Sequence, residues 1–148
     1  GVFFGGDDAQ LTWSPTSEAI KSLPFSLVGI SEAEQTKATD RDPQTVLFTT
    51  SKELIIDLGK NTEVSQFLYL PDQSDAHRGL IHSYTISACD AKGNVIKTLK
   101  SDEFSNIQNN PILQTVTFPA TTTRFLKLSA DRMVKEGEQI GIAELGVK

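Results

Sequence analysis

The chain contains 148 residues, the size of one domain that buries roughly 70% of its unfolded surface. Its 38% hydrophobic and 22% charged residues exclude a disordered chain, and no apolar run approaches the roughly 20 residues of a membrane-spanning helix. A net charge of -5 disfavours a nucleic-acid partner. The single cysteine, Cys89, excludes both an internal disulfide and a zinc site with two or more thiolate ligands.

The chain begins with an irregular lead-in over residues 1–26. Ser14 followed by Pro15 is typical of a helix N-terminus, so this lead-in is predicted to contain a short helix over residues 14–20. Residues 27–30 are apolar and predict a first short strand.

From Glu53 onward, short apolar runs and strict alternation of apolar and polar residues predict about seven strands and no long helix. A turn from Asp90 to Gly93 joins two of them into a hairpin. The predicted strands cover residues 54–58, 67–70, 82–89, 95–99, 115–118, 126–129 and 140–147. This pattern predicts one all-β domain, an antiparallel β-sandwich of jelly-roll type. The predicted core comprises Ile56, Leu58, Phe67, Tyr84, Ile86, Val116, Phe118, Leu126 and Leu128.

The sequence gives no support for a catalytic function. It has no glycine-rich phosphate loop, no Gly-x-Ser-x-Gly elbow and no His-Glu-x-x-His. His77 and His82 are five residues apart, which suits a loop and a strand edge better than a metal pair. With 19 acidic residues, neighbours such as Asp102 and Glu103 are expected by chance. We therefore expect that this chain is not itself an enzyme.

Residues 37–45 resemble the Ala-x-Asp-Gly-Asp-x-x-Thr loop of discoidin domains, also called coagulation factor V/VIII C-type domains. The sugar-binding members of that family form carbohydrate-binding module family 32. Further segments resemble the family in the family's own order, namely residues 53–59, 67–73, 84–87, 124–128 and 143–145. Residues 104–111 look most like the domains appended to bacterial exo-glycosidases such as α-L-fucosidases.

The resemblance implies a structural calcium ion, which would tie the early loop to the last strand. Oxygen ligands for calcium are available at the matching positions, Lys37, Asp40, Asp42, Thr45, Ala143 and Glu144. The alternative is an ordinary aspartate-rich turn around Pro43. The glycine of the family's loop is Arg41 here, which would strain a backbone that needs a positive φ.

The sugar site departs from the family. The galactose-binding members carry His, Trp, Arg and Asn where this chain has Phe48, Ser51, Asp72 and Arg78. We therefore expect no measurable binding of simple galactosides, because the stacking ring and the donor fork are missing. The remaining candidates for binding a different glycan are Asp72, His77, Arg78 and Arg132. The alternative is a solvated loop with surface ion pairs of little energetic value.

Two hypotheses remain. The first is a non-catalytic glycan-binding domain attached in cis to a larger bacterial glycosidase, an α-L-fucosidase or a related exo-glycosidase. The second is a purely structural sandwich that packs on the catalytic domain without sugar affinity. The resemblance implies a periplasmic or extracellular location. Because the chain begins with Gly1 rather than Met, we expect it to be a piece of a longer protein.

Overall fold

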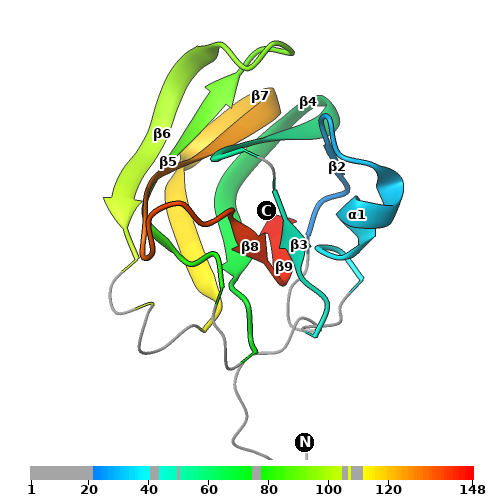
Figure 1. Cartoon of the computed structure of the whole chain (residues 1–148). Coiled ribbons are helices and arrows are strands. Elements are labelled where there is room, and N and C mark those ends of the chain that lie inside the picture. Colours follow the sequence, from blue (N-terminus) through cyan, green and yellow to red (C-terminus); the bar gives the residue numbers. More distant parts are fainter. Residues whose placement is uncertain (1–21, 41–43, 50, 75–77, 105–106, 108–111) are drawn as a thin grey trace, which may run out of the picture.

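The computed structural model describes residues 22–40, 44–49, 51–74, 78–104, 107 and 112–148 (Figure 1). Nearly all the regular structure is strand. The elements are β2 (Ser26–Leu27), α1 (Glu32–Thr36), β3 (Leu47–Phe48), β4 (Glu53–Leu70), β5 (Ile81–Cys89), β6 (Val95–Glu103), β7 (Gln114–Met133), β8 (Gly141–Ile142) and β9 (Glu144–Val147). The helix predicted over residues 14–20 lies outside the described residues. Within the described part of the chain, no helix is long and apolar enough to cross a membrane.

Two long strands, β4 and β7, organise the main sheet. Its order is β2-β4-β7-β5-β6, and β9 pairs with β4 on the edge that β2 also uses, so that every pairing is antiparallel. The sheet curves strongly, with α1 and β2 on one side and β5 and β6 on the opposite side (Figure 1). A second, two-stranded sheet pairs β3 with β8. The prediction of an antiparallel β-sandwich is therefore confirmed.

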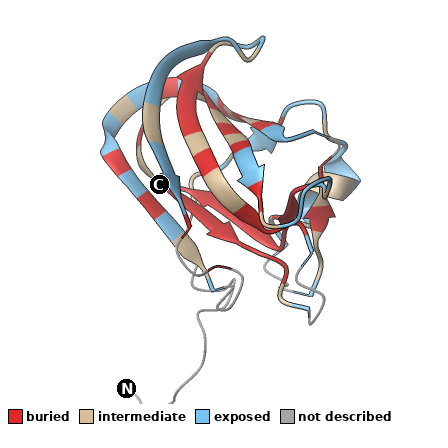
Figure 2. Cartoon of the chain, turned by 60° about the vertical axis from the view of Figure 1, so that its left-hand side comes forward, coloured by how far each residue is buried: buried red, intermediate tan, exposed pale blue. Residues whose placement is uncertain are grey.

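The buried apolar residues form one large core cluster and a second, small one, and Figure 2 shows where the buried positions lie along the strands. All nine residues that the sequence pattern assigns to the core are buried: Ile56, Leu58, Phe67, Tyr84, Ile86, Val116, Phe118, Leu126 and Leu128. Burial of aliphatic and aromatic side chains on this scale is the main stabilising contribution to such a fold. β6 is the exception, since it pairs only with β5 and is mostly exposed, with Ile96 71% accessible.

The strand boundaries differ from those that the sequence pattern predicts. Residues 54–58 and 67–70 belong to the single strand β4, although Gly59 has a φ of 84° and the register with β7 shifts beyond Asp57. A bulge of this kind bends a strand without ending it. The predicted strands at 115–118 and 126–129 are likewise both parts of β7. The predicted last strand is instead divided between β8 and β9, which pair with different partners.

The helix α1 was not predicted from the sequence. Ser31 is its N-cap, and the Ser31 hydroxyl accepts a hydrogen bond from the Glu34 backbone N–H at 3.3 Å. The predicted strand over residues 27–30 is correspondingly shorter, because β2 ends at Leu27. The side-chain oxygen of Gln35 accepts from the Leu27 backbone N–H at 3.0 Å, which fixes α1 against β2.

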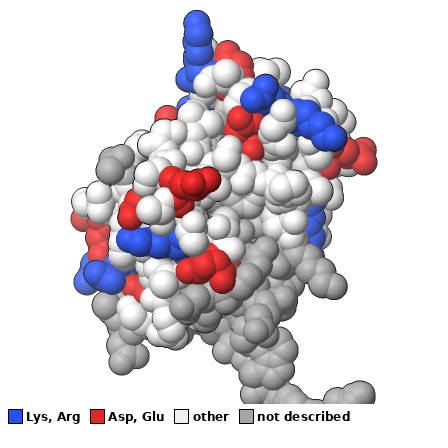
Figure 3. Space-filling model, turned by 90° about the vertical axis from the view of Figure 1, so that its right-hand side faces the viewer, with Lys and Arg blue, Asp and Glu red and all other residues white. Residues whose placement is uncertain are grey.

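The segment that precedes β2 lies against the last strand. The Leu23 backbone N–H donates to the Val147 carbonyl at 2.8 Å, and the Val147 N–H donates to the Ser22 hydroxyl at 2.9 Å. Positions 125 residues apart in the sequence are thus neighbours. On the face that carries α1, acidic and basic side chains are interspersed and form no patch of one sign (Figure 3).

Candidate functional site

A pocket of about 420 Å³ opens where three loops meet, and its volume falls within the range of small-molecule sites. The loops are the end of β3, the connection from β4 to β5 and the connection from β7 to β8. The pocket is lined by Phe48, Arg78, Gly79, Gly137, Glu138 and Gln139.

The floor of this pocket depends on the close approach of two glycines. Gly141 lies opposite Phe48 in the β3–β8 pair, and its N–H donates to the Gly79 carbonyl at 3.0 Å. A Cβ on Gly79 would lie 2.2 Å from the Gly141 nitrogen, so no larger residue fits there. The hydroxyl of the buried Tyr69 donates to the Gly141 carbonyl at 3.2 Å, and burial raises the pKa of Tyr69 well above its ordinary value. Tyr69 therefore remains a hydrogen-bond donor to this floor at neutral pH.

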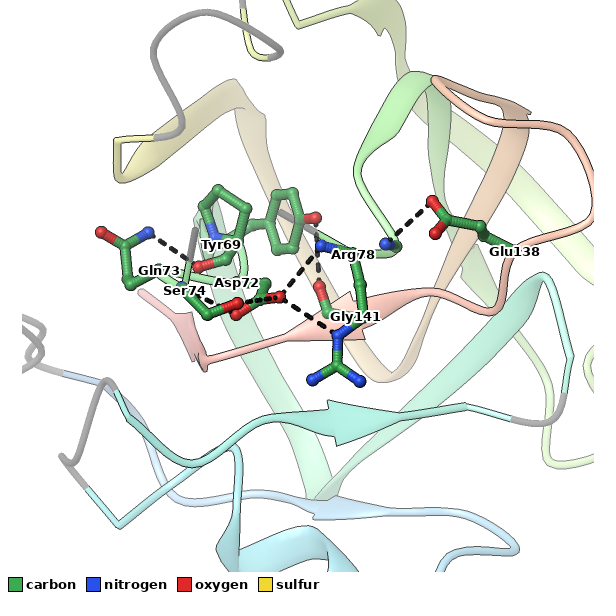
Figure 4. Close-up of polar contacts among 9 residues, drawn as sticks. Tyr69, Asp72, Gln73, Ser74, Arg78, Glu138 and Gly141 are labelled. Atoms are coloured by element: carbon green, nitrogen blue, oxygen red, sulfur yellow. Dashed lines mark hydrogen bonds and ion pairs between the residues drawn. The ribbon is translucent and has the colours of Figure 1, made fainter. Parts of the chain in front are cut away.

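Asp72 is a buried carboxylate that organises the β4–β5 loop (Figure 4). It accepts hydrogen bonds of 2.9 Å from the N–H and the hydroxyl of Ser74 and from the backbone N–H of Arg78. Burial alone would raise the pKa of Asp72, but these hydrogen bonds and the Arg78 charge outweigh it, and the pKa lies below its ordinary value. Asp72 is therefore a charged anchor for the loop and does not line the pocket.

Arg78 extends from that loop over the ring of Phe48. Its Cζ atom lies 4.7 Å from the ring centroid, which is a cation–π contact. Its Nε lies 3.7 Å from an oxygen of Asp72, and its side chain is 57% accessible. The two terminal nitrogens make no hydrogen bond or ion pair within the described part of the chain, and Figure 4 shows them pointing away from Asp72. Arg78 is thus an oriented donor at the wall of the pocket.

Glu138 provides an acceptor in the same pocket, and it was not predicted from the sequence. One of its carboxylate oxygens accepts from the Gly79 N–H at 3.1 Å (Figure 4). The polar stretch Lys135 to Gln139 looks like any solvated loop, and acidic residues are common in such loops. Only the tertiary approach of this loop to Gly79 brings Glu138 into the pocket, and its contact with Gly79 spans about 60 positions in sequence.

The structure does not bring all of the predicted sugar-binding residues together. Asp72 and Arg78 are in contact, as described above. Arg132 lies exposed in β7 opposite Ser83 and does not line the pocket. His77 lies outside the described residues. Ser51, at the position of the family's stacking tryptophan, is exposed and accepts from the Glu53 N–H at 3.1 Å.

The predicted metal ligands lie on two segments that are far apart in sequence and are joined by a hydrogen bond between residues next to them. The Thr45 hydroxyl donates to Asp40 at 2.6 Å and also lies 3.4 Å from the Lys37 carbonyl. Glu144 is fully buried at the start of β9. The next residue joins the two segments, because the Leu145 N–H donates to the Ala38 carbonyl at 3.0 Å.

Of the remaining two predicted ligands, the structure describes only one. Ala143 is buried, and its N–H donates to the Leu70 carbonyl at 2.8 Å, while Asp42 lies outside the described residues. Among the residues that the structure describes, no three His, Cys, Asp or Glu side chains cluster tightly enough to hold a metal by themselves. The described donor set is therefore two carboxylates supplemented by a hydroxyl and main-chain carbonyls. Oxygen donors of these types fit a hard cation such as calcium.

The curved antiparallel sandwich, with a ligand-sized pocket on the loops at one end, places the chain among β-sandwich binding domains. The sequence model of the F5/8 type C domain matches residues 30–145, and the chain belongs to this family. A comparison with curated protein sequences found no match.

Solved structures agree with this assignment. The chain is similar to the family 32 carbohydrate-binding module of Clostridium perfringens NanJ in complex with galactose, with 25% identity, a TM-score of 0.63 and coverage of 84% of this chain and 91% of the other. It also shares its fold with CpGH89CBM32-5 from Clostridium perfringens, in complex with GalNAc-β-1,3-galactose, at 20% identity and a TM-score of 0.64, over 84% of this chain and 93% of the other. A glycoside hydrolase 29 family member from an unknown rumen bacterium matches at 26% identity and a TM-score of 0.61. That match covers 82% of this chain and 21% of the hydrolase chain.

Proposed function

We propose that this chain is a non-catalytic glycan-binding domain that serves a larger bacterial glycoside hydrolase. The observation that carries the proposal is the pocket at Phe48, where Arg78 supplies donors and Glu138 supplies an acceptor. A sugar is recognised through hydroxyl groups, which both donate and accept hydrogen bonds, so a wall with both kinds of group suits it. Membership of the F5/8 type C family and the likeness to family 32 modules support this reading.

Attachment to a hydrolase is the second part of the proposal. The match to the glycoside hydrolase 29 family member, of whose chain this domain spans about a fifth, supports an appended arrangement. Together with the resemblance of residues 104–111, it favours an α-L-fucosidase or a related exo-glycosidase as the parent enzyme. Such an enzyme would act in the periplasm or outside the cell, where its glycan substrates are found.

We also propose that a calcium ion joins the early loop to the last strand. Lys37 and Ala143 would contribute carbonyl oxygens, Asp40, Asp42 and Glu144 carboxylates, and Thr45 its hydroxyl or carbonyl. The hydrogen bonds that already draw Asp40, Thr45 and Lys37 together, and the burial of Glu144, support this donor set. When bound, the ion supplies only structural charge neutralisation, and no chemical step is assigned to it.

One observation favours the alternative of a purely structural domain. Arg78 covers one face of the Phe48 ring, the aromatic group among the described lining residues of the pocket, so that face is not open to a sugar. A glycan array probed with the 148-residue chain separates the two functions. Retention of any glycan by the wild-type chain, lost on Arg78→Ala, supports the binding function. An absence of binding across the array refutes it and leaves the structural role.

A further inference from the structure

The pocket has a chemical character that narrows its ligand, and this inference rests on the glycan-binding function proposed above. We infer that it takes neutral sugars by clamping two adjacent equatorial hydroxyls with the Arg78 guanidinium, and that it disfavours both sugars without such a pair and acidic sugars. Three features of the described residues carry the inference: the covered aromatic ring, the pre-oriented arginine and the charges around it.

The first feature is that the aromatic ring of the pocket is already engaged. Phe48 is the one aromatic residue among its described lining residues, and Arg78 covers one face of the ring. The Cε1 edge of the ring lies close to Gly141, where an added Cβ would come within 2.9 Å of Cε1. A sugar whose binding relies on an apolar face therefore gains little here. Recognition must come from hydroxyl groups.

The second feature is that Arg78 is held ready for those hydroxyls. The Asp72 carboxylate accepts a hydrogen bond from the Arg78 backbone N–H and lies 3.7 Å from the Arg78 Nε. The Phe48 ring packs against one side of the guanidinium. The terminal nitrogens then project as a planar fork with two parallel donors. Adjacent equatorial hydroxyls lie near the mean plane of a pyranose ring, so both oxygens can meet this fork edge-on. An axial hydroxyl lies out of that plane, so allose, whose axial O3 lies between O2 and O4, offers the fork no adjacent equatorial pair on the ring.

The third feature is the charge balance around the fork. Arg78 is the one cation among the described lining residues; its Nε lies 3.7 Å from the Asp72 carboxylate, and the Glu138 carboxylate lines the same pocket. A sugar carboxylate would enter a site whose cation is already matched and would meet a second acid. The Glu138 carboxylate has one oxygen engaged by the Gly79 N–H and makes no further hydrogen bond or ion pair within the described part of the chain. Its other oxygen is therefore an acceptor for a hydroxyl, which only a neutral sugar supplies without repulsion.

The test is an NMR titration of the ¹⁵N-labelled 148-residue chain with three probes: methyl β-D-glucopyranoside, methyl β-D-allopyranoside and sodium D-glucuronate. We expect saturable chemical-shift changes of the Gly79 and Gln139 amides at millimolar glucoside, none with the alloside, and weaker ones with glucuronate. Arg78→Lys keeps the charge but loses the planar fork. It should weaken glucoside binding about tenfold, which corresponds to about 1.4 kcal/mol.

Two further variants sharpen the test. Arg132→Lys makes the same change at an exposed arginine outside the pocket and should leave the titration unchanged. Glu138→Gln removes the repulsion and should tighten glucuronate binding.

Alloside or glucuronate binding as tightly as the glucoside refutes this inference alone, as does an Arg78→Lys variant that titrates like the wild type. The same holds if the three probes fail while the array retains another glycan. If neither the probes nor the array show binding, the proposed function falls together with the inference.

Discussion

Substituting the glycines around the pocket tests the packing that builds it. Gly79→Ala introduces two costs, because Gly79 has a φ of 72° and a Cβ there would lie 2.2 Å from the Gly141 nitrogen and 2.5 Å from the Gln139 carbonyl. A positive φ costs a non-glycine residue roughly 1–2 kcal/mol. Overpacking adds roughly 1–3 kcal/mol. We expect Gly79→Ala to lower the free energy of unfolding by roughly 2–5 kcal/mol.

Two other glycines separate the two costs. Gly137 has a φ of 87° with open space around a Cβ, so Gly137→Ala should cost only roughly 1–2 kcal/mol from the backbone. Gly141 is not among the positive-φ glycines, but its Cβ would lie 2.6 Å from the Arg78 carbonyl, so Gly141→Ala should show the overpacking cost alone, roughly 1–3 kcal/mol.

The assay is urea denaturation of the three variants, followed by circular dichroism, with thermal melting as a second measurement. For a domain of this size, each 1 kcal/mol lowers Tm by roughly 2–4 °C. If Gly79→Ala is no less stable than Gly137→Ala, Gly79 and Gly141 do not approach each other as closely as described. The pocket floor would then need another explanation.

Three further predictions concern the metal, the buried acid and the core. EDTA should lower the Tm of the wild type, because a ligand that binds only the native state stabilises it, and should leave Asp40→Ala unaffected; equal sensitivity of both would contradict the proposed site. The pKa of Asp72 is lowered in the folded state, so the stability that its charge contributes is present above its unfolded pKa, about 4, and is lost as pH falls further. Asp72→Asn should flatten that acid limb in denaturation measured from pH 6 to pH 2 (roughly the range over which carboxylates titrate), and an unchanged limb would show that Asp72 is not the group responsible. Ile86→Ala, at a fully buried position, should cost roughly 2–5 kcal/mol, whereas Ile96→Ala on the exposed edge strand should change stability by less than about 0.5 kcal/mol in the same urea assay.

Alternation along the strands was sufficient to predict the core. Side chains such as Ile86 and Leu128 face inward because the pleat repeats every two residues, and one face of the sheet is buried. Strand ends were harder to predict. Gly59 was interpreted as the end of a strand, but its positive φ produces a bulge within β4. A local turn signal does not show whether the chain reverses or only bends, since the neighbouring strand decides that.

The sequence does contain a helix N-terminus pattern at the start of α1, although this helix was not predicted. Ser31 followed three residues later by Glu34 is a capping-box pattern, and the structure shows the Ser31 side chain in that role. The pocket, in contrast, was predictable only in part. Arg78 could be identified by its position in the family's pattern, but Glu138 reaches the pocket only through a tertiary contact with Gly79. Spacing along the chain contains no information about such a contact.

The proximity of Ser22 to Val147 has a consequence for how this domain can be linked to other polypeptides. Val147 lies in β9, and hydrogen bonds of 2.8 Å from the Leu23 N–H and 2.9 Å to the Ser22 hydroxyl join it to the segment that precedes β2. Polypeptide entering before Ser22 and leaving after Val147 would therefore meet the sandwich at one point, and the domain could be inserted into a surface loop of a host protein without spreading that loop apart. The same geometry favours circular permutation, in which a short linker joins these neighbours and new termini open at the tip of the β5–β6 hairpin.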